Sequence, residues 1–376
     1  MERLGRGLVA VRQDSGRVFV SWRLLGTDPD GVAFNLYRIV GGAAPVRVNP
    51  TPLTGPTSTT DRVFVSAPVA YMVRAVVNGA ELAPSERFTL RPAAPYLSLT
   101  LRTPDGYTPN DGSVGDLDGD GEYELVVHQV GRGRDNSQKG VTTNPILEAY
   151  RLDGTFVWRI DLGRNVREGA HYTQFIVYDL DGDGRAEVAC KTADGTVDGT
   201  GKVIGDASAD HRNADGFIAK GPELLTVFDG RTGAAIASAP FVPRRHPDTD
   251  APTPEQQRAV WGDANYNRMD RFLAGVAYLD GVRPSLIMAR GYYTRAVVTA
   301  WDWRGGMKRV VASAAPVRPS KIVRSSRPFT MKPSALRWSA LESPMTLPIP
   351  STVPSAVLHA TSARPSPSRS YTMNCV

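Results

Sequence analysis

The stretch DLDGDGEYE at residues 116–124 runs directly into the apolar run LVV, and this junction of loop and strand decides the fold. Nearly the same string, DLDGDGRAE, recurs at residues 179–187 and is followed by VAC. A worn copy, YLDG, stands at residues 278–281 ahead of the apolar run SLIM. Because an acidic, glycine-rich loop leads each time into a run of strand length, the sequence predicts a repeated unit of β-structure.

Each unit also carries a hairpin in which an aromatic residue precedes the turn. The three aromatic residues are Tyr150, Phe228 and Trp301, and they lie at intervals of 78 and 73 residues. Two alternating strand pairs per unit, repeated with loop insertions, indicate the blades of a β-propeller. Only about three units are visible, and closure of a propeller takes four or more.

Upstream of the repeats, residues 1–93 predict a small β-sandwich. Alternating strands such as RVFVSW (17–22) and YMVRAV (71–76) are separated by turn residues. Trp22 on an early strand and Tyr71 on a late strand suit an immunoglobulin or fibronectin type III core. The proline-rich residues 91–95 form the expected linker to the repeats.

The composition indicates an all-β protein and gives no sign of a membrane span or of a nucleic acid partner. No run of 18 or more apolar residues is present, so no membrane span is expected, and the first residues do not form a signal peptide. Residues from Arg304 onward hold 11 Lys and Arg and one acid, which leaves the rest of the chain mildly acidic. The net charge of +6 therefore does not indicate a nucleic acid partner.

The pattern stops abruptly after the third unit. Residues 307–376 contain no Gly and no Asp, and Ser and Pro dominate them. We expect residues 306–376 to be a non-native or disordered tail without regular structure. The abruptness of the change, inside a repeat unit, favours a shifted reading frame over a natural disordered tail.

The acidic loops predict two calcium sites. Calcium prefers six to eight oxygen ligands in a flexible loop, and Gly at loop positions 4 and 6 lets the backbone wrap around an ion. Carboxylates at loop positions 1, 3, 5 and 9 and the carbonyl at position 7 are the expected ligands. They belong to Asp116, Asp118, Asp120, Glu122 and Glu124 in the first loop, and to Asp179, Asp181, Asp183, Arg185 and Glu187 in the second. No helices flank these loops, so a structural role is favoured over that of a calcium sensor.

Polar and aromatic residues gather where strands enter or leave these loops, at residues 167–174, 191–196 and 290–295. In a propeller the ends of the innermost strands face the central channel, where ligands bind. These three segments therefore predict a ligand site at the channel.

Several long strings make the chain resemble the rhamnogalacturonan lyases of polysaccharide lyase family eleven, over about residues 1–305. They are LGRGLVAV (4–11), GAHYTQ (169–174), KTADGT (191–196), WGD (261–263), DRFLAG (270–275) and RGYY (290–293). The resemblance implies a fibronectin-like domain over residues 1–93 and part of an eight-bladed, calcium-rich propeller over residues 94–305. It also implies an extracellular enzyme whose partner is the pectic polysaccharide rhamnogalacturonan I, with no nucleic acid or membrane partner.

The chemistry implied by the resemblance is β-elimination at a 4-linked galacturonate. A base takes the proton on C5 and the C4 oxygen is the leaving group, while a cation neutralises the neighbouring carboxylate. His171, Lys191 and Arg290 are the candidate catalytic residues. The base stays open among them, Tyr292 and the part of the family fold that is absent here. The candidate substrate-binding residues are Asn110, Tyr172, Asp194, Tyr292 and Arg295.

The sequence departs from the family pattern in two places. Where relatives carry a Trp-Asp-Pro segment this chain has Val130 in the place of the acid, and the later blades are absent. The chain is therefore expected to be truncated and inactive. The alternative is a non-catalytic, calcium-stabilised propeller that binds carbohydrate or mediates adhesion.

Overall fold

The computed structural model describes residues 2–90, 97–169, 171–304, 306–316, 359–361 and 371–375. These residues form antiparallel β-sheets and one short helix, so the all-β class predicted from the sequence is confirmed. The predicted linker at 91–95 and most of the expected tail lie outside the described residues. Within the described part of the chain, no helix has the length and apolar character that a membrane span requires.

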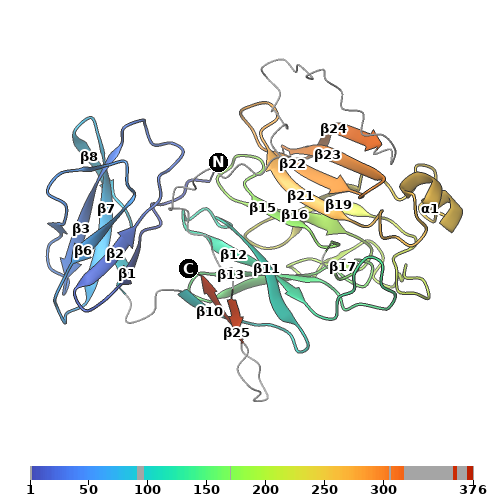
Figure 1. Ribbon diagram of the computed structural model, residues 1–376, viewed down its shortest axis with the longest axis horizontal. Helices are drawn as coiled ribbons and strands as arrows, with labels where there is room; N and C mark the ends of the chain where they lie inside the picture. The colour runs from blue at the N-terminus through green and yellow to red at the C-terminus, as the bar shows by residue number, and fades with distance from the viewer. Residues whose placement is uncertain are drawn as a thin grey trace.

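The N-terminal residues form two sheets around one core (Figure 1). One sheet has the order β1-β2-β6, and the other has the order β4-β3-β7-β8, with β5 beside β3 and β9 beside β7. Trp22 and Tyr71, the two aromatic residues singled out in the sequence, are both buried in this core. The strands are β1 (Val9–Arg12), β2 (Arg17–Ser21), β3 (Ala33–Val40), β4 (Val46–Arg47), β5 (Leu53–Thr54), β6 (Ser58–Arg62), β7 (Val69–Val77), β8 (Ala80–Pro84) and β9 (Phe88–Thr89).

Three further sheets follow, one for each repeat unit. The first has the order β11-β12-β13-β14-β17-β18, the second β15-β16-β19-β20 and the third β21-β22-β23-β24. Their strands are β11 (Thr108–Gly115), β12 (Glu124–Val130), β13 (Ile146–Arg151), β14 (Phe156–Asp161), β15 (Phe175–Tyr178), β16 (Glu187–Thr192), β17 (Thr196–Val197), β18 (Val203–Ile204), β19 (Leu224–Phe228), β20 (Ala235–Pro240), β21 (Phe272–Ala277), β22 (Ser285–Arg290), β23 (Arg295–Trp303) and β24 (Met307–Pro316).

The repeat read from the sequence is reproduced in the pairing register. In each sheet the hairpin aromatic pairs with the second residue of the strand that follows the loop, and a register shift occurs beside it. The pairs are Tyr150 with Leu125, Phe228 with Val188, and Trp301 with Leu286. The three units are therefore copies of one structural module.

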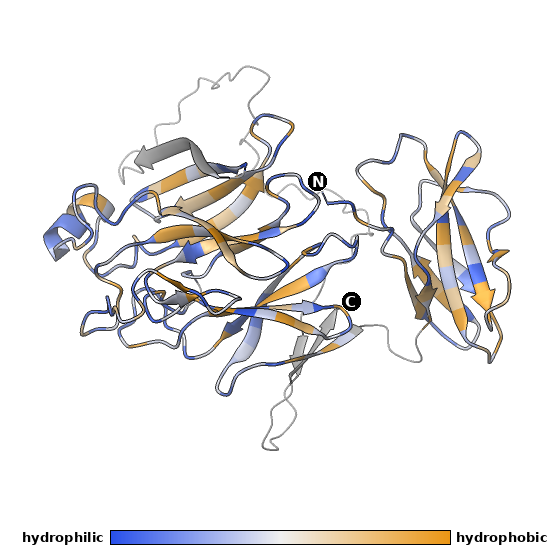
Figure 2. Cartoon of the chain, turned by 180° about the vertical axis from the view of Figure 1, so that it is seen from behind, coloured by the Kyte–Doolittle hydropathy of each residue, from blue (hydrophilic) through white to orange (hydrophobic). Residues whose placement is uncertain are grey.

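The sheets stack because each buries apolar side chains against its neighbour. Figure 2 shows that hydrophobic residues are frequent along their strands. Val126 of the first sheet shares a core with Val188 of the second. Val227 of the second sheet shares a core with Met288 of the third. Burial of these aliphatic faces, worth about 25 cal/mol per Å² of apolar surface, favours the stacked order over separate sheets.

Three strands lie inside the segment expected to form a tail without regular structure. β24 extends the third sheet as the hairpin partner of β23, which offers an open edge to the chain that follows it. β25 (His359–Thr361) and β26 (Tyr371–Cys375) pair with each other, and β26 pairs with β10 (Leu97–Leu101). The backbone therefore differs from the expectation at these positions.

The single helix among the described residues is α1 (Pro254–Trp261). Thr253 caps it in a capping box with Gln256, and Gly262 ends it in the left-handed conformation. The helix delivers Trp261 into the interior, where its indole N–H donates to the Arg245 carbonyl at 2.6 Å.

Candidate functional site

The two acidic loops fold alike. Asp116 accepts backbone hydrogen bonds from Gly119 at 2.7 Å and from Gly121 at 2.9 Å, and Glu124 accepts one from Leu117 at 2.8 Å. Both glycines have positive φ, which L-residues with side chains rarely adopt. The second loop repeats these bonds at the corresponding residues Asp179, Gly182, Gly184, Glu187 and Leu180.

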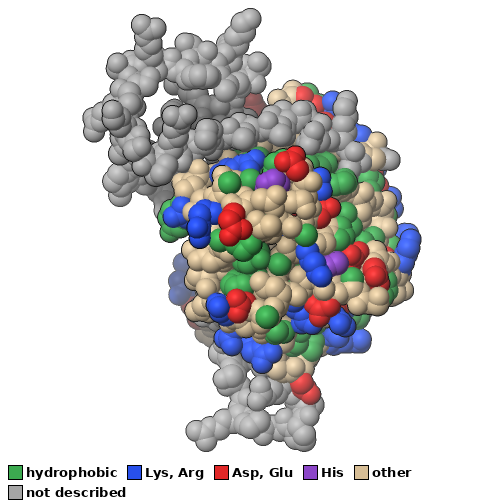
Figure 3. Space-filling view, turned by 90° about the vertical axis from the view of Figure 1, so that its right-hand side faces the viewer, with side chains coloured by type: hydrophobic (Ala, Val, Ile, Leu, Met, Phe, Trp, Pro, Cys, Tyr) green, Lys and Arg blue, Asp and Glu red, His purple; other side chains and the backbone are tan. Residues whose placement is uncertain are grey.

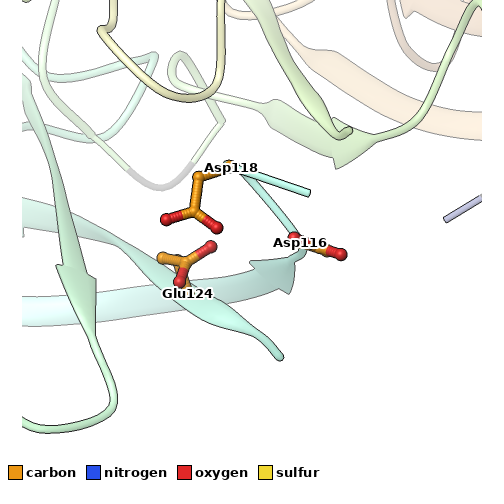
Figure 4. A group of neighbouring side chains, drawn as sticks. All are labelled: Asp116, Asp118 and Glu124. Carbon is orange, nitrogen blue, oxygen red and sulfur yellow. The ribbon is translucent and has the colours of Figure 1, made fainter. Parts of the chain in front are cut away.

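Each loop gathers three carboxylates that could hold a metal ion. In the first loop, oxygen atoms of Asp116, Asp118 and Glu124 lie within 4.8 Å of one another. Figure 4 shows the carboxylates of Asp118 and Glu124 facing each other at the start of β12, with Asp116 beside them. The matching group in the second loop consists of Asp179, Asp181 and Glu187.

The electrostatics of both loops favour a bound cation. Burial, reinforced by the neighbouring aspartates, raises the pKa of Glu124 to about 7 and that of Glu187 to about 8. Carboxylates held this close repel one another, and a divalent ion removes that repulsion. Two carboxylates in each loop are buried, while Asp118 is half-buried and paired with Arg151 and Asp181 is exposed. These oxygen ligands and the positive-φ glycines fit a hard cation such as calcium.

The remaining predicted ligands lie at the outer side of the loops. Asp120 accepts a hydrogen bond from the backbone of Glu122 at 2.9 Å. Asp183 accepts one from the backbone of Arg185 at 2.8 Å and also pairs with its guanidinium at 2.8 Å. These carboxylates therefore stand outside the two groups of three.

The third, worn loop lacks the carboxylate group. Its Asp280 pairs with Arg283 at 2.9 Å, and Ser285 takes the strand position held by glutamate in the other two loops. Ser285 instead donates to Asp302 at 2.7 Å. Among the described residues, groups of three metal-binding side chains occur only in the first two loops.

A hollow of about 360 Å³ lies at the opposite end of β12 from its acidic loop. Asn110 and Val130 both line it. A β-bulge between Pro109 and Gly112 turns Asn110 out of the β11 ladder, and this leaves it exposed. The structure thus brings the predicted substrate-binding Asn110 and the family departure at Val130 to one place.

The wall of this hollow contains a buried pair that sequence reasoning missed. His128 Nε2 lies 3.1 Å from Glu168 Oε2, and both side chains are almost fully buried. His128 Nδ1 and Thr173 Oγ1 are buried, line the hollow's wall and have no hydrogen-bond partner among the described residues. The only sequence signal was the charged dipeptide Arg167-Glu168 ahead of a glycine and a strand.

His171 is not itself a lining residue of the hollow, but it stands in the turn between the lining residues Gly169 and Thr173. It keeps part of its surface exposed. Burial and then the nearby Arg271 lower the pKa of the imidazole below its ordinary value. The ring is therefore neutral at pH 7 and can accept a proton.

Lys191 and Arg290, the other two catalytic candidates, lie in a buried ion cluster and do not line the hollow. Glu223 is the centre of this cluster: it contacts Lys191 Nζ at 3.1 Å, Arg245 Nη2 at 3.3 Å and Arg290 Nη1 at 2.7 Å. Arg290 also contacts Asp270 at 3.0 Å and has no exposed surface. This geometry suits the positioning of neighbouring segments and does not offer either side chain to a ligand.

Burial and the ion pairs within the cluster together determine its charge state. Burial lowers the pKa of Lys191 and raises that of Asp270. Burial would also raise the pKa of Glu223, but the three surrounding cations outweigh it and hold that pKa well below its ordinary value. Glu223 is therefore ionised at every ordinary pH.

The other predicted substrate-binding residues are dispersed. Tyr172 is buried and its hydroxyl accepts from Arg167, while Asp194 pairs with His211 at 2.8 Å. Tyr292 is exposed, and the Arg295 guanidinium lies 4.7 Å from the centre of the Trp261 ring. On the face shown in Figure 3, acidic, basic and histidine side chains are interspersed, so this face carries no large field of a single sign.

Two family models match the chain. The model described as "Rhamnogalacturonan lyase family 11, C-terminal domain" matches residues 100–312. The model described as "Rhamnogalacturonan I lyases beta-sheet domain" matches residues 1–90. Together they cover both parts of the fold, the two-sheet domain and the three stacked sheets.

Individual relatives agree with these matches. The chain is 52% identical over 319 residues to the rhamnogalacturonan endolyase YesW of Bacillus subtilis, covering 81% of this chain and 48% of the relative. It is 50% identical over 317 residues to the rhamnogalacturonan exolyase YesX of the same organism, covering 81% and 49%. The crystal structure of YesX matches with a TM-score of 0.75 and 48% identity, over 84% of this chain and 51% of that one. The chain thus spans about half the length of the relatives it matches.

Proposed function

We propose, from the premise that this chain belongs to rhamnogalacturonan lyase family 11, that its hollow binds rhamnogalacturonan I for cleavage by β-elimination. The observation that carries the proposal is the meeting of Asn110 and the His128–Glu168 pair around one hollow, with His171 in the turn between two of its lining residues. Relatives with both endolytic and exolytic names support the substrate class. All residues that line the hollow come from residues 108–173. The first sheet and the segment that leads into the second sheet therefore form its walls.

His171 is the base in this proposal. The proton on C5 of a galacturonate passes to the imidazole, and the electron pair forms the C4–C5 double bond. The bond from C4 to its oxygen breaks, and this oxygen leaves on the neighbouring rhamnose and takes up a proton from water. A neutral imidazole is needed to accept the proton, and the lowered pKa of His171 supplies it at pH 7. Asn110 offers amide donor and acceptor atoms to sugar hydroxyls at the mouth of the hollow.

Lys191 and Arg290 have a positioning role. Arg290 lies between the rings of Trp261 and Phe272, at 5.4 and 5.2 Å from their centres. Phe272 donates its backbone N–H to the His171 carbonyl at 3.0 Å. The buried cluster therefore holds the backbone of Phe272 in place, and through this hydrogen bond the backbone at His171.

The finer architecture follows from the same premise. The three stacked sheets are blades of a β-propeller, and the N-terminal domain is of the fibronectin type III kind. The loops at 116–124 and 179–187 each hold a calcium ion, whose chemistry is to neutralise the clustered carboxylates and stiffen the loop. Since the substrate is a plant cell-wall polysaccharide, the site of action is extracellular.

The lyase proposal is tested with two forms of the protein, because the chain spans about half of its relatives. One is the 376-residue chain, and the other is a chimera in which residues 1–312 precede the second half of the Bacillus subtilis endolyase. With rhamnogalacturonan I and calcium, we expect the ultraviolet absorbance of an unsaturated uronate from the chimera and none from the 376-residue chain. A folded chimera that binds the polysaccharide without producing that absorbance would contradict the proposal.

The base is tested in the same chimera. His171→Ala should lower kcat by about 10²–10⁴-fold, the usual contribution of a general base, with the melting temperature unchanged. His246→Ala is the matched control, because His246 lies outside residues 108–173, which supply every lining residue of the hollow, and it should leave kcat unaltered. An equal loss of kcat in both variants, or a loss that follows the melting temperature, would remove His171 from the mechanism.

A further inference from the structure

A row of polar and aromatic residues continues from the hollow across the edge of the third sheet. His171 accepts a backbone hydrogen bond from Phe272 at 3.0 Å, and Arg271 accepts one from Gly291 at 2.8 Å. These two bonds place Arg271 between His171 and the exposed Tyr292. The row therefore leads from the hollow to an aromatic surface.

Arg271 is the cation in this row without a carboxylate partner. Its Nε and Nη2 donate to the carbonyl and side-chain oxygens of Asn267, both at 3.2 Å, which fixes the guanidinium plane. Among the described residues no carboxylate lies within ion-pair distance of it, whereas the neighbouring Arg268 lies 3.7 Å from Asp263. The side chain is only partly buried, so its free edge can meet a ligand.

An aromatic platform adjoins this cation. The Arg271 guanidinium lies 4.8 Å from the centre of the Tyr292 ring, which in turn lies 3.7 Å from the ring of Tyr293. The two tyrosines are 43% and 59% exposed, and Tyr293 has a positive φ of 61°. A bulky residue rarely adopts that conformation, and such strained positions cluster at functional sites.

We propose that Arg271 and Tyr292 form a uronate-binding subsite next to the hollow, in which the guanidinium pairs with a galacturonate carboxylate and the sugar ring packs on the tyrosine. Arg presents planar paired donors that match a carboxylate, and a tyrosine ring gives an apolar face to the C–H groups of a sugar. The assignment rests on the proposed function, to which it adds a specificity residue. Asp135, which lines the hollow together with Asp111 and Glu168, lies close enough to act electrostatically on both the His171 imidazole and Arg271.

The test measures binding of two ligands to the 376-residue chain by calorimetry. One ligand is a rhamnogalacturonan I oligosaccharide, and the other is the same oligosaccharide with its carboxylates reduced to alcohols. Arg271→Gln should weaken binding of the acidic ligand by about 10-fold to 100-fold, as expected for a charge-assisted hydrogen bond, and leave binding of the reduced ligand unchanged. Arg271→Lys keeps the charge and the fold, and should lose part of the affinity for the acidic ligand only.

Arg283→Gln is the matched control, since Arg283 is an exposed arginine on the worn loop and pairs with Asp280. It should bind both ligands as the parent chain does. Equal weakening of both ligands by Arg271→Gln, or no weakening of the acidic one, would overturn the subsite while leaving the proposed function in place. Failure of the parent chain to bind either ligand would overturn the subsite, whereas the proposed function is overturned by the chimera.

Discussion

Removal of divalent cations with a chelator is expected to lower the melting temperature of the stacked sheets by roughly 10–20 °C at pH 8. Each site adds about 2.7 kcal/mol to the free energy of unfolding when free calcium is a hundredfold above its Kd. Two sites therefore contribute about 5 kcal/mol, and about 1 kcal/mol shifts the melting temperature by roughly 2–4 °C in a domain of this size. Scanning calorimetry with calcium and with chelator measures the difference.

The same difference should depend on pH. Without metal, the folded pKa values of Glu124 and Glu187 are about 7 and 8, above the ordinary value of 4.5. Between about pH 4.5 and pH 8 the folded state then binds more protons than the unfolded state, so stability of the metal-free protein falls as the pH rises. The effect of chelation should accordingly be small at pH 5 and largest at pH 8.

The worn loop offers an internal control for the metal sites. Asp181→Asn should lower the calcium stoichiometry by one, because Asp181 belongs to a group of three carboxylates. Asp280→Asn, at the same position of the third loop, should leave the stoichiometry unchanged, because Asp280 is paired with Arg283 and has no such group. A melting curve that does not change on addition of the chelator, or equal effects of the two substitutions on calcium stoichiometry, would show that the loops are metal-free turns.

The sequence could predict the loops and their strands because both depend on residues that are adjacent in the chain. Aspartates at loop positions 1, 3 and 5 with Gly at positions 4 and 6 determine a local backbone, and the hydrogen bonds of Asp116 and Asp179 reproduce each other. The recurrence of an aromatic residue in each hairpin was also visible in the sequence, and the three aromatics occupy equivalent positions in the pairing register. Local patterns of this kind are the most reliable part of sequence interpretation.

The sequence could not place Lys191 and Arg290, because their surroundings come from distant segments. The Arg290 partners Glu223 and Asp270 are 67 and 20 residues away in the chain. A basic residue at a strand end looks the same in sequence whether it faces a channel or a buried carboxylate. Asn110 faces the hollow because of a β-bulge, which the sequence did not indicate. Arg271 belongs to the family-like string DRFLAG (270–275) and has no other signal in the sequence. Long-range pairing and local irregularity thus decide which polar residues can meet a ligand.

Glu223→Ala is expected to destabilise the stacked sheets by about 3–5 kcal/mol, the usual cost of removing one partner from a buried ion pair. The substitution leaves Lys191, Arg245 and Arg290 buried with Asp270 as the remaining carboxylate of the cluster. Asp250→Asn is the matched control: its pair with Arg244 is about half exposed, and exposed pairs contribute about 0–1 kcal/mol. Urea unfolding of the calcium-loaded chain measures both. Similar midpoints for the two variants would mean that the cluster is tolerant of an unpaired charge, and that Lys191 and Arg290 are then free to act on a ligand, as the sequence first indicated.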